Sequence, residues 1–261
     1  MNLETNETNT QLNVLMGRNP IREAIKKGRS IDRLLVAEGN TDGSVKEIVK
    51  LARDRRVVVV EVSRNKLDEL CMPYGYGGRP GNHQGMVAIL PAKEYCSVED
   101  IFQDAKEKGQ PLFLILLDGI QDPHNLGAIL RSAEALGAHG VVLPKRRSAP
   151  LNAAAAKASA GAIEYVKVAQ VANLPALIQE LKGQGVWVVG ASMDGQAAYE
   201  ADLSGPLALV VGSEGEGLSR LVKERCDFLV SVPLVGKMES YNASVAAGIL
   251  MYEKYRQSRG K

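Results

Sequence analysis

The sequence predicts an α/β protein with a larger C-terminal domain built on a parallel sheet and a smaller α/β domain before it. The first observation is that near-continuous apolar segments alternate with helical patterns through the second half of the chain. Such segments are typical of parallel strands that helices cover on both faces. The second is length, because 261 residues can form two modest domains, each with its own core. The third is composition, since 45% hydrophobic and 24% charged residues are the balance of an ordinary soluble globular protein.

The smaller domain is expected over residues 12–90. Its predicted elements are a helix at 20–27, a strand at 31–37, a helix at 44–53, a buried strand at 57–62, a short helix at 63–70 and a strand at 86–90. Asn19 and Ser63 are polar residues at helix starts, so we expect them to be N-caps. A glycine-rich segment, 74–85, precedes the last strand.

The flanking segments lack these patterns. Residues 1–11 are polar and have neither the basic start nor the apolar stretch of a signal peptide, so we expect a disordered leader of a cytoplasmic protein. Residues 91–110 are charged and are expected to form a linker that contains one short helix. No apolar run reaches the roughly 20 residues that a membrane helix needs.

The larger domain is expected over residues 111–261. Its predicted strands are 112–117, 140–143, 164–168, 186–191, 207–211 and 228–232. Its predicted helices are 125–137, 151–160, 173–183, 218–225 and 242–257. In such sheets the ligand site lies beyond the carboxyl ends of the strands, so the residues after those ends are where chemistry is expected.

Charge and cysteine content narrow the classes of function. Residues 1–90 carry 14 Lys and Arg against 11 Asp and Glu, whereas residues 91–261 carry 18 against 19. For any single basic cluster a solvated surface is the favoured explanation, but the skew as a whole weakly supports an N-terminal domain that faces phosphate groups. The three cysteines are far apart, and neither they nor the three histidines have metal-ligand spacing. We therefore expect no metal and no disulfide framework.

The first segment with chemical potential runs from Asp118 to Arg131 (DGIQDPHNLGAILR) and joins a buried strand to a helix. Asn125 and Arg131 are six residues apart, so they lie within about 120° of each other around the helix axis. Gly127 keeps the first turn slim enough for another backbone to approach. A helix capped by Asn125 is the simpler alternative, but so dense a cluster of polar, Gly and Pro residues at a strand end favours function.

Two more segments follow predicted strands. Residues 210–218 (VVGSEGEGL) contain three glycines, which allow a sharp turn with exposed amides. This turn matches neither the dinucleotide fingerprint nor a P-loop, and a ligand-free turn explains it equally well. Residues 240–246 (SYNASVA) begin the last long helix, where Ser240 or Asn242 is an ordinary cap or part of a ligand pocket.

Together these three segments resemble the signature motifs of the SpoU-type (TrmH-like) RNA ribose methyltransferases, in the same order and spacing from the C-terminus. The first 90 residues resemble that family's accessory substrate-binding domain through 17–20 (GRNP) and 82–88 (NHQGMVA). The branch that it resembles most methylates a guanosine ribose in large-subunit ribosomal RNA. The resemblance implies S-adenosylmethionine as cofactor, structured RNA as partner, a trefoil knot in the C-terminal domain, and a homodimer with active sites at its interface.

The resemblance also implies site residues. Those expected to contact S-adenosylmethionine, largely through backbone groups, are Gly212, Val232, Leu234 and Tyr241, with Ala191 and Ser244 as further neighbours. The implied catalytic residues are Asn125 and Arg131, with Glu214, Ser240 and Asn242 nearby. In the family the arginine is often proposed as the base, but a guanidinium stays protonated and has no acceptor. We therefore expect Arg131 to hold a phosphate and stabilise the developing alkoxide, and Asn125 to orient it or the hydroxyl.

The substrate is less defined than the chemistry. The glycine-rich segment offers Tyr74, Tyr76, Arg79 and His83 for stacking and phosphate contacts, although a flexible loop explains it equally well. A tRNA target keeps the same chemistry. An RNA-binding or assembly factor without catalysis is a further alternative, against which the intact polar motifs argue. A nucleotide-dependent dehydrogenase is disfavoured because its fingerprint is missing.

Overall fold

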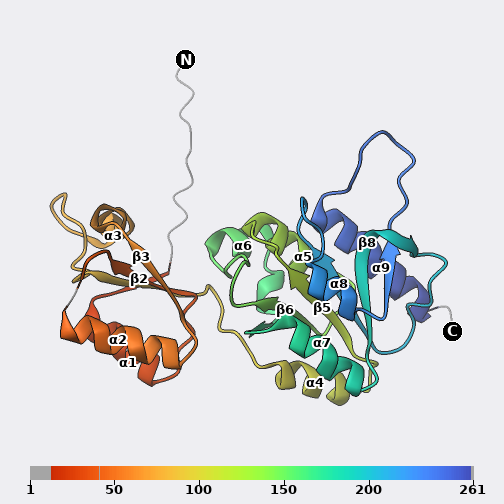
Figure 1. The fold of residues 1–261 in the computed structure, drawn as a ribbon, viewed down its shortest axis with the longest axis horizontal. Helices are drawn as coiled ribbons and strands as arrows, with labels where there is room; N and C mark the ends of the chain where they lie inside the picture. The colour runs from red at the N-terminus through yellow and green to blue at the C-terminus, as the bar shows by residue number, and fades with distance from the viewer. Residues whose placement is uncertain (1–12, 41, 260–261) are drawn as a thin grey trace. The chain divides into compact units, whose positions relative to one another are not determined.

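The computed structural model describes residues 13–40 and 42–259 (Figure 1). These residues form two compact units: the first comprises the chain up to Ala92 together with residues 152–154, and the second comprises the remainder from Lys93 onward. The expected leader, 1–11, lies outside the described residues. Among the residues that are described, no helix is long and apolar enough to cross a membrane.

The first unit is built on a mixed four-stranded sheet. Its strands, in spatial order, are β1 (Val14–Met16), β4 (Met86–Ile89), β2 (Arg33–Ala37) and β3 (Val58–Val62). Only β4 runs opposite to the other three. Helices α1 (Arg18–Lys26) and α2 (Gly43–Asp54) pack on one face through a core that includes Ile21 and Ile48, and α3 (Arg64–Cys71) packs on the other through Leu67. A short 3-10 turn, η1 (Met72–Tyr74), follows α3.

Two details of this unit differ from the sequence prediction. Helix α1 begins at Arg18, after Gly17, and has no side-chain cap, so the prediction that Asn19 is the N-cap is wrong. Strand β3 is half-buried rather than buried, because it lies at the edge of the sheet where one flank faces solvent. The prediction for Ser63 is confirmed, since its hydroxyl accepts the Lys66 amide at the start of α3.

The second unit is built on a six-stranded sheet in which every neighbouring pair is parallel. Its spatial order is β10 (Phe228–Ser231), β8 (Trp187–Ala197), β9 (Leu207–Gly212), β5 (Phe113–Asp118), β6 (Gly140–Pro144) and β7 (Lys167–Val171). The parallel sheet predicted from the apolar segments is therefore confirmed. Strand β7 begins three residues later than predicted, because residues 162–164 form a 3-10 turn, η2 (Ala162–Glu164).

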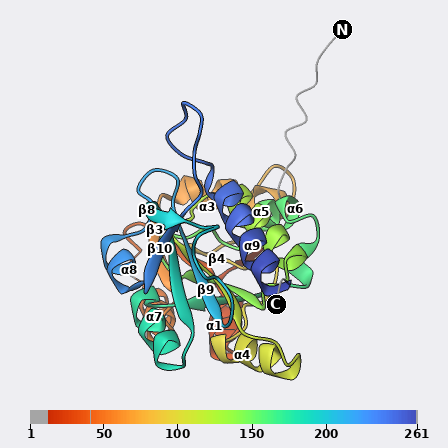
Figure 2. The same ribbon diagram turned by 90° about the vertical axis from the view of Figure 1, so that its right-hand side faces the viewer.

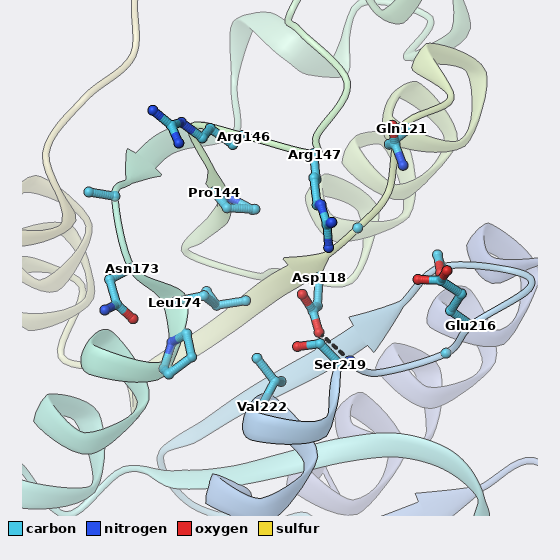
Figure 3. Close-up of a pocket in the computed structure, with 15 residues that line it drawn as sticks. Asp118, Gln121, Pro144, Arg146, Arg147, Asn173, Leu174, Glu216, Ser219 and Val222 are labelled. Carbon is cyan, nitrogen blue, oxygen red and sulfur yellow. Dashed lines mark hydrogen bonds between the residues drawn. The ribbon is translucent and has the colours of Figure 1, made fainter. Parts of the chain in front are cut away.

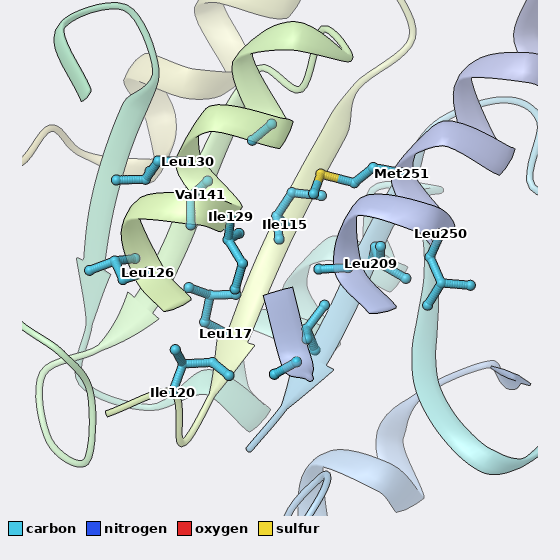
Figure 4. Close-up of a cluster of buried hydrophobic side chains, with 14 of the residues drawn as sticks. Ile115, Leu117, Ile120, Leu126, Ile129, Leu130, Val141, Leu209, Leu250 and Met251 are labelled. Atoms are coloured by element: carbon cyan, nitrogen blue, oxygen red, sulfur yellow. The ribbon is translucent and has the colours of Figure 1, made fainter. Parts of the chain in front are cut away.

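Helices cover both faces of this sheet. One face carries α5 (Pro123–Ala135), α6 (Ala153–Ala158) and α9 (Ala243–Arg259), and the other carries α4 (Val98–Glu107), α7 (Leu174–Gly183) and α8 (Arg220–Arg225). Side chains of β5 alternate between the two cores: Ile115 and Leu117 meet α5 and α9 (Figure 4), whereas Leu114 packs with α4 and α7. This double coverage explains why the strands are apolar along their whole length.

The segment 91–110, which we expected to be a linker, belongs largely to the second unit. It contains α4, whose start is closed by a reciprocal capping box between Ser97 and Asp100. Ile101 of α4 is fully buried in the core beneath the sheet, and it contacts the position where Gly140 begins β6. The charged residues that suggested a linker occupy the solvent side of an amphipathic helix.

Candidate functional site

Three strand ends gather around one pocket in the second unit. Strands β8, β9 and β10 lie side by side (Figure 2), and the pocket is lined by the second half of β8, by the segments that follow β9 and β10, and by the beginning of α9. The pocket has a volume of about 840 Å³. This size lies within the roughly 300–1,000 Å³ that is usual for small-molecule and cofactor sites.

Most residues predicted to contact the cofactor line this pocket. Those on its wall are Ala191, Gly212, Val232, Leu234 and Tyr241. Ser244 is not among the lining residues. Its amide and hydroxyl instead donate to Asn242 Oδ1, at 3.0 and 2.6 Å, and so help to form the first turn of α9.

Gly212 is required by the geometry of the pocket wall. The turn after β9 folds back tightly, and two backbone hydrogen bonds join Ser213 to Gly217, at 3.1 and 3.0 Å. A Cβ on Gly212 would lie 2.2 Å from the carbonyl carbon of Gly217, a distance that no side chain tolerates. Glycine is therefore the residue that lets this turn close over the end of the strand.

Three predicted catalytic residues form a hydrogen-bonded cluster, although they lie far apart in the sequence. The Asn125 amide donates to Glu214 Oε1 at 3.0 Å, and the Asn242 amide donates to Asn125 Oδ1, also at 3.0 Å. Asn242 also donates to the same carboxylate oxygen of Glu214. We call these residues the Asn–Glu–Asn cluster. Because Glu214 itself lines the pocket, the cluster sits at its edge.

The capping of α5 and α9 leaves this cluster free to form. Asp122, not Asn125, caps α5 by accepting the His124 amide at 3.0 Å, so the alternative in which Asn125 is only a cap is wrong. Asn242 does cap α9, but it uses its oxygen, which accepts the amides of Ser244 and Val245. Its NH₂ group is therefore held pointing away from the helix, toward Glu214 and Asn125.

The other two predicted catalytic residues stand apart from the cluster. Ser240 lines the pocket and is exposed. Arg131 is exposed on α5 and does not line the pocket, and its guanidinium forms no hydrogen bond or ion pair with any residue that the structure describes. The close approach predicted at Gly127 is present, because a Cβ there would lie 2.6 Å from the Ala155 carbonyl oxygen of α6.

An ion pair on the pocket wall was not predicted from the sequence. Lys223 of α8 and Asp194 of β8 form an ion pair at 2.5 Å. This contact lowers the pKa of Asp194 from its ordinary value, first through the hydrogen bond and then through the charge of the lysine. Asp194 was missed because β8 runs to Ala197, well past the end of its apolar segment.

The glycine-rich segment of the first unit separates into exposed and buried residues. Tyr76 is 96% exposed, and Arg79 is also exposed. His83 is only 4% exposed, and its ring accepts the Gly85 amide at 3.0 Å while its other nitrogen lies 2.9 Å from Asp68. The expectation that His83 is available to RNA is therefore wrong, since this ring anchors the start of β4.

The chain belongs to the SpoU rRNA methylase family. The sequence profile of that family matches residues 112–252, and the profile described as RNA 2′-O ribose methyltransferase substrate binding matches residues 14–96. The two profiles correspond to the two units of the structure. The protein is thus an RNA ribose 2′-O-methyltransferase of the SpoU/TrmH type, a class that acts on tRNA or rRNA.

Relatives and solved structures agree with this assignment. Bacillus subtilis YacO, named for the TrmH family of tRNA/rRNA methyltransferases, is 44% identical over 248 residues, 95% of this chain and 96% of that one. A Staphylococcus aureus protein named for the same family is 45% identical over 94% of this chain and 96% of its own length. The SpoU methyltransferase AviRb from Streptomyces viridochromogenes, solved in complex with AdoMet, is 25% identical with a TM-score of 0.56, covering 94% of this chain and 89% of that one.

The family uses S-adenosylmethionine, and the residues of the pocket fit this group. Its lining includes the backbone of the Gly212 turn and apolar side chains such as Leu250. The acidic lining residues are Asp194, Glu214, Glu216 and Glu239, against the single lysine Lys223. This acidic excess suits a ligand that carries both a sulfonium and an ammonium charge. Among the described residues, no group of three His, Cys, Asp or Glu side chains could hold a metal ion.

Proposed function

We propose that this chain methylates the 2′-hydroxyl of a guanosine in large-subunit ribosomal RNA. The observation that carries the proposal is the Asn–Glu–Asn cluster, which unites residues from three separate segments beside the cofactor pocket. The choice of rRNA is supported by the description of the matching family and by the resemblance of both units to the rRNA-methylating branch.

The cluster provides the groups that a ribose hydroxyl needs. S-adenosylmethionine, when bound, supplies a methyl group on a good leaving group, so the chain must chiefly align the hydroxyl and accept its proton. The two asparagine amides occupy one oxygen of the Glu214 carboxylate, and the second oxygen is left to accept from the 2′-hydroxyl. Glu214 is thus a chemically competent base, whereas Arg131 is not.

Arg131 suits an electrostatic role instead. Its guanidinium is exposed and forms no hydrogen bond or ion pair with the described residues, so it is available to a phosphate of bound RNA. A bidentate contact of this kind fixes the ribose and stabilises negative charge on the attacking oxygen. This assignment keeps both residues of the first motif in the reaction and requires no deprotonated arginine.

A homodimer and a trefoil knot are further parts of the proposal. The outer face of α9 supports the dimer, because Val245, Ile249 and Tyr252 are 49%, 39% and 56% exposed and lie on one side of the helix. Exposed apolar side chains in such a row are typical of an interface between subunits. The knot is supported by the family resemblance of the segments from β9 to α9.

The first unit is proposed to bind structured RNA. Tyr76 offers a ring face for stacking, and Arg79 offers a guanidinium for a phosphate. The matching profile over 14–96 is described as a substrate-binding domain, which supports this division of labour.

A methyl-transfer assay tests the proposal. Purified protein and labelled S-adenosylmethionine are incubated with large-subunit rRNA and with tRNA, both taken from cells that lack the enzyme. We expect the label in 2′-O-methylguanosine of rRNA. Label in tRNA alone would instead support a second candidate function, methylation of a tRNA ribose. That candidate is favoured by a solved structure titled for 2-OH methylation of C/U34 on tRNA, which is 28% identical over 58% of this chain with a TM-score of 0.53. If neither RNA is labelled, the protein is better explained as an RNA-binding factor that does not catalyse methyl transfer.

A further inference from the structure

A second pocket adjoins the cofactor pocket in the same unit. It has a volume of about 470 Å³ and lies at the carboxyl ends of β5, β6 and β7 (Figure 3). The two pockets share Ser213, Glu216 and Gly217, so the turn after β9 is their common wall. Glu214 of the Asn–Glu–Asn cluster belongs to this same turn. A ligand in the second pocket would therefore lie next to the group undergoing reaction.

The loop after β6 brings two arginines to this pocket. Arg146 and Arg147 are exposed and form no hydrogen bond or ion pair with any described residue. Figure 3 shows Arg147 extending toward Asp118 across the pocket, whereas Arg146 points away from it. Arg147 is thus an unpaired guanidinium directed into a cavity, the side chain best suited to bind a phosphate in two places at once.

The loop that carries Arg147 is fixed in position. Its backbone is tied to the sheet by the Lys145 amide, which donates to the Val171 carbonyl at 2.9 Å, and by the Ala149 amide, which donates to Ile120 at 2.7 Å. The Ser148 hydroxyl closes the loop onto Pro144. Because the backbone is already ordered, a ligand need only immobilise the arginine side chain itself.

The remaining lining matches a nucleobase. Pro144 is partly exposed and supplies apolar surface for a flat ring, and the exposed Gln121 supplies an amide for its polar edge. The Asp118 carboxylate is oriented by the Ser219 amide, which donates to one of its oxygens at 2.7 Å. Its other oxygen can accept from a base N–H group. Unpaired RNA bases are recognised through such combinations of ring contact and edge hydrogen bonds.

We propose that this second pocket binds the nucleotide next to the one being methylated, with its phosphate on Arg147 and its base against Gln121 and Asp118. The inference rests on the proposed function, since it requires an RNA substrate. The second pocket would thus help to select the RNA sequence around the methylated ribose. It lies in the second unit and is distinct from the RNA-binding surface proposed for the first unit.

Steady-state methyl transfer to whichever of the two RNAs the wild type accepts tests the inference. Arg147→Asn removes the guanidinium, and asparagine tolerates the positive φ of 56° that Arg147 adopts. We expect the KM for RNA to rise about tenfold, and the dependence of log KM on log salt to weaken by about 0.7–0.9, the value for one phosphate contact. The Kd for S-adenosylmethionine should stay unchanged. Gln121→Ala, at an exposed position, should raise the same KM with no change in salt dependence.

The control is Lys108→Asn, which removes one positive charge at the end of α4, before the amino end of β5. A wild-type KM in this variant separates a local contact from a general charge effect. If Arg147→Asn and Gln121→Ala both keep the wild-type KM while the wild type methylates RNA, the inference is overturned and the proposed function stands. Loss of S-adenosylmethionine binding in Arg147→Asn would also overturn it. If the wild-type protein labels neither RNA, the proposed function is contradicted, and the inference that rests on it is contradicted as well.

Discussion

The two units use the polar residues beside their strands in different ways. In the first unit such residues stabilise the fold: Asp42 caps α2 and also accepts from the Arg18 guanidinium of α1, and Ser63 caps α3. In the second unit Asn242 caps α9 with its oxygen and still donates from its nitrogen to Glu214, which follows a different strand. The capping residues of the first unit therefore hold its helices in place, whereas Asn242 of the second unit also contributes to the candidate site.

Sheet topology explains the difference. All six strands of the second sheet are parallel, so every strand ends at the same edge, and loops distant in sequence are brought together there. In the first unit β4 runs against its neighbours, and β3, at the edge, is only half-buried. The comparison indicates that the second unit holds the reactive site, and it is consistent with a substrate-binding role for the first unit, as the profile over residues 14–96 is described.

The largest effect is expected at the cofactor pocket of the second unit. Gly212→Val would drive side-chain atoms into the Gly217 backbone and open the turn. We expect S-adenosylmethionine to bind at least about 100-fold more weakly, which is about 3 kcal/mol, as measured by calorimetry. The matched control is Gly215→Ala in the same turn, where a Cβ would meet nothing within 4 Å. Equal affinities for the two variants would contradict this account of the pocket wall.

The next largest effect is expected at Arg131. Arg131→Lys keeps a positive charge but loses the planar guanidinium that forms bidentate hydrogen bonds with a phosphate. We expect kcat to fall about 100-fold, the usual cost of losing one donor that stabilises transition-state charge. Calorimetry with S-adenosylmethionine should give the wild-type Kd, because Arg131 does not line that pocket. Near-normal turnover would eliminate both the phosphate role and the role as base.

Within the first unit, Tyr76 should affect RNA alone. Tyr76→Ala removes a side chain that is 96% exposed and packs against nothing. Loss of one stacked base costs about 1–3 kcal/mol, so the KM for RNA should rise about five- to 100-fold while kcat stays unchanged. A wild-type KM would exclude this tyrosine from the RNA-binding surface.

His83 should affect stability alone. His83→Ala leaves the buried Gly85 amide without its acceptor and removes the contact with Asp68. We expect the free energy of unfolding of the first unit to fall by about 1–3 kcal/mol, measured by urea denaturation. Tyr76→Ala is the matched control and should leave the unfolding curve unchanged. If His83→Ala instead binds RNA more weakly while keeping wild-type stability, His83 is an RNA contact and its structural role is contradicted.

The smallest effect concerns the acid stability of the first unit. Hydrogen bonds from Ser44 and the Arg18 guanidinium lower the pKa of Asp42 from 3.8 to about 2. A lowered folded-state pKa stabilises the fold above pH 3.8, and that contribution disappears as the pH falls toward 2. Asp42→Asn keeps a capping side chain but loses the charge. We expect its melting temperature to lie slightly below that of the wild type at pH 7, and this difference should shrink between pH 4 and 2. A difference that stays constant over this range would show that the charge of Asp42 is not its cause.

Most elements of the second unit could be predicted from the sequence, because uninterrupted apolar runs identify doubly covered parallel strands. In the segment 91–110 the short helix was predicted, but its packing was not, since the burial of Ile101 depends on a sheet that begins after it. Motif resemblance placed Asn125, Glu214 and Asn242 in one site, but their hydrogen bonds depend on how α5 and α9 approach β9. Nor did any sequence signal distinguish buried His83 from exposed Tyr76, because their difference comes from tertiary packing.

The central claim is that the Asn–Glu–Asn cluster presents Glu214 to the ribose hydroxyl. The most direct measurement is the single-turnover rate of methyl transfer by Glu214→Gln, with S-adenosylmethionine and RNA both saturating. This variant keeps the size of the side chain and removes its capacity to accept a proton. The account predicts a rate at least about 100-fold below that of the wild type, the usual contribution of a general base. A rate close to that of the wild type would contradict it.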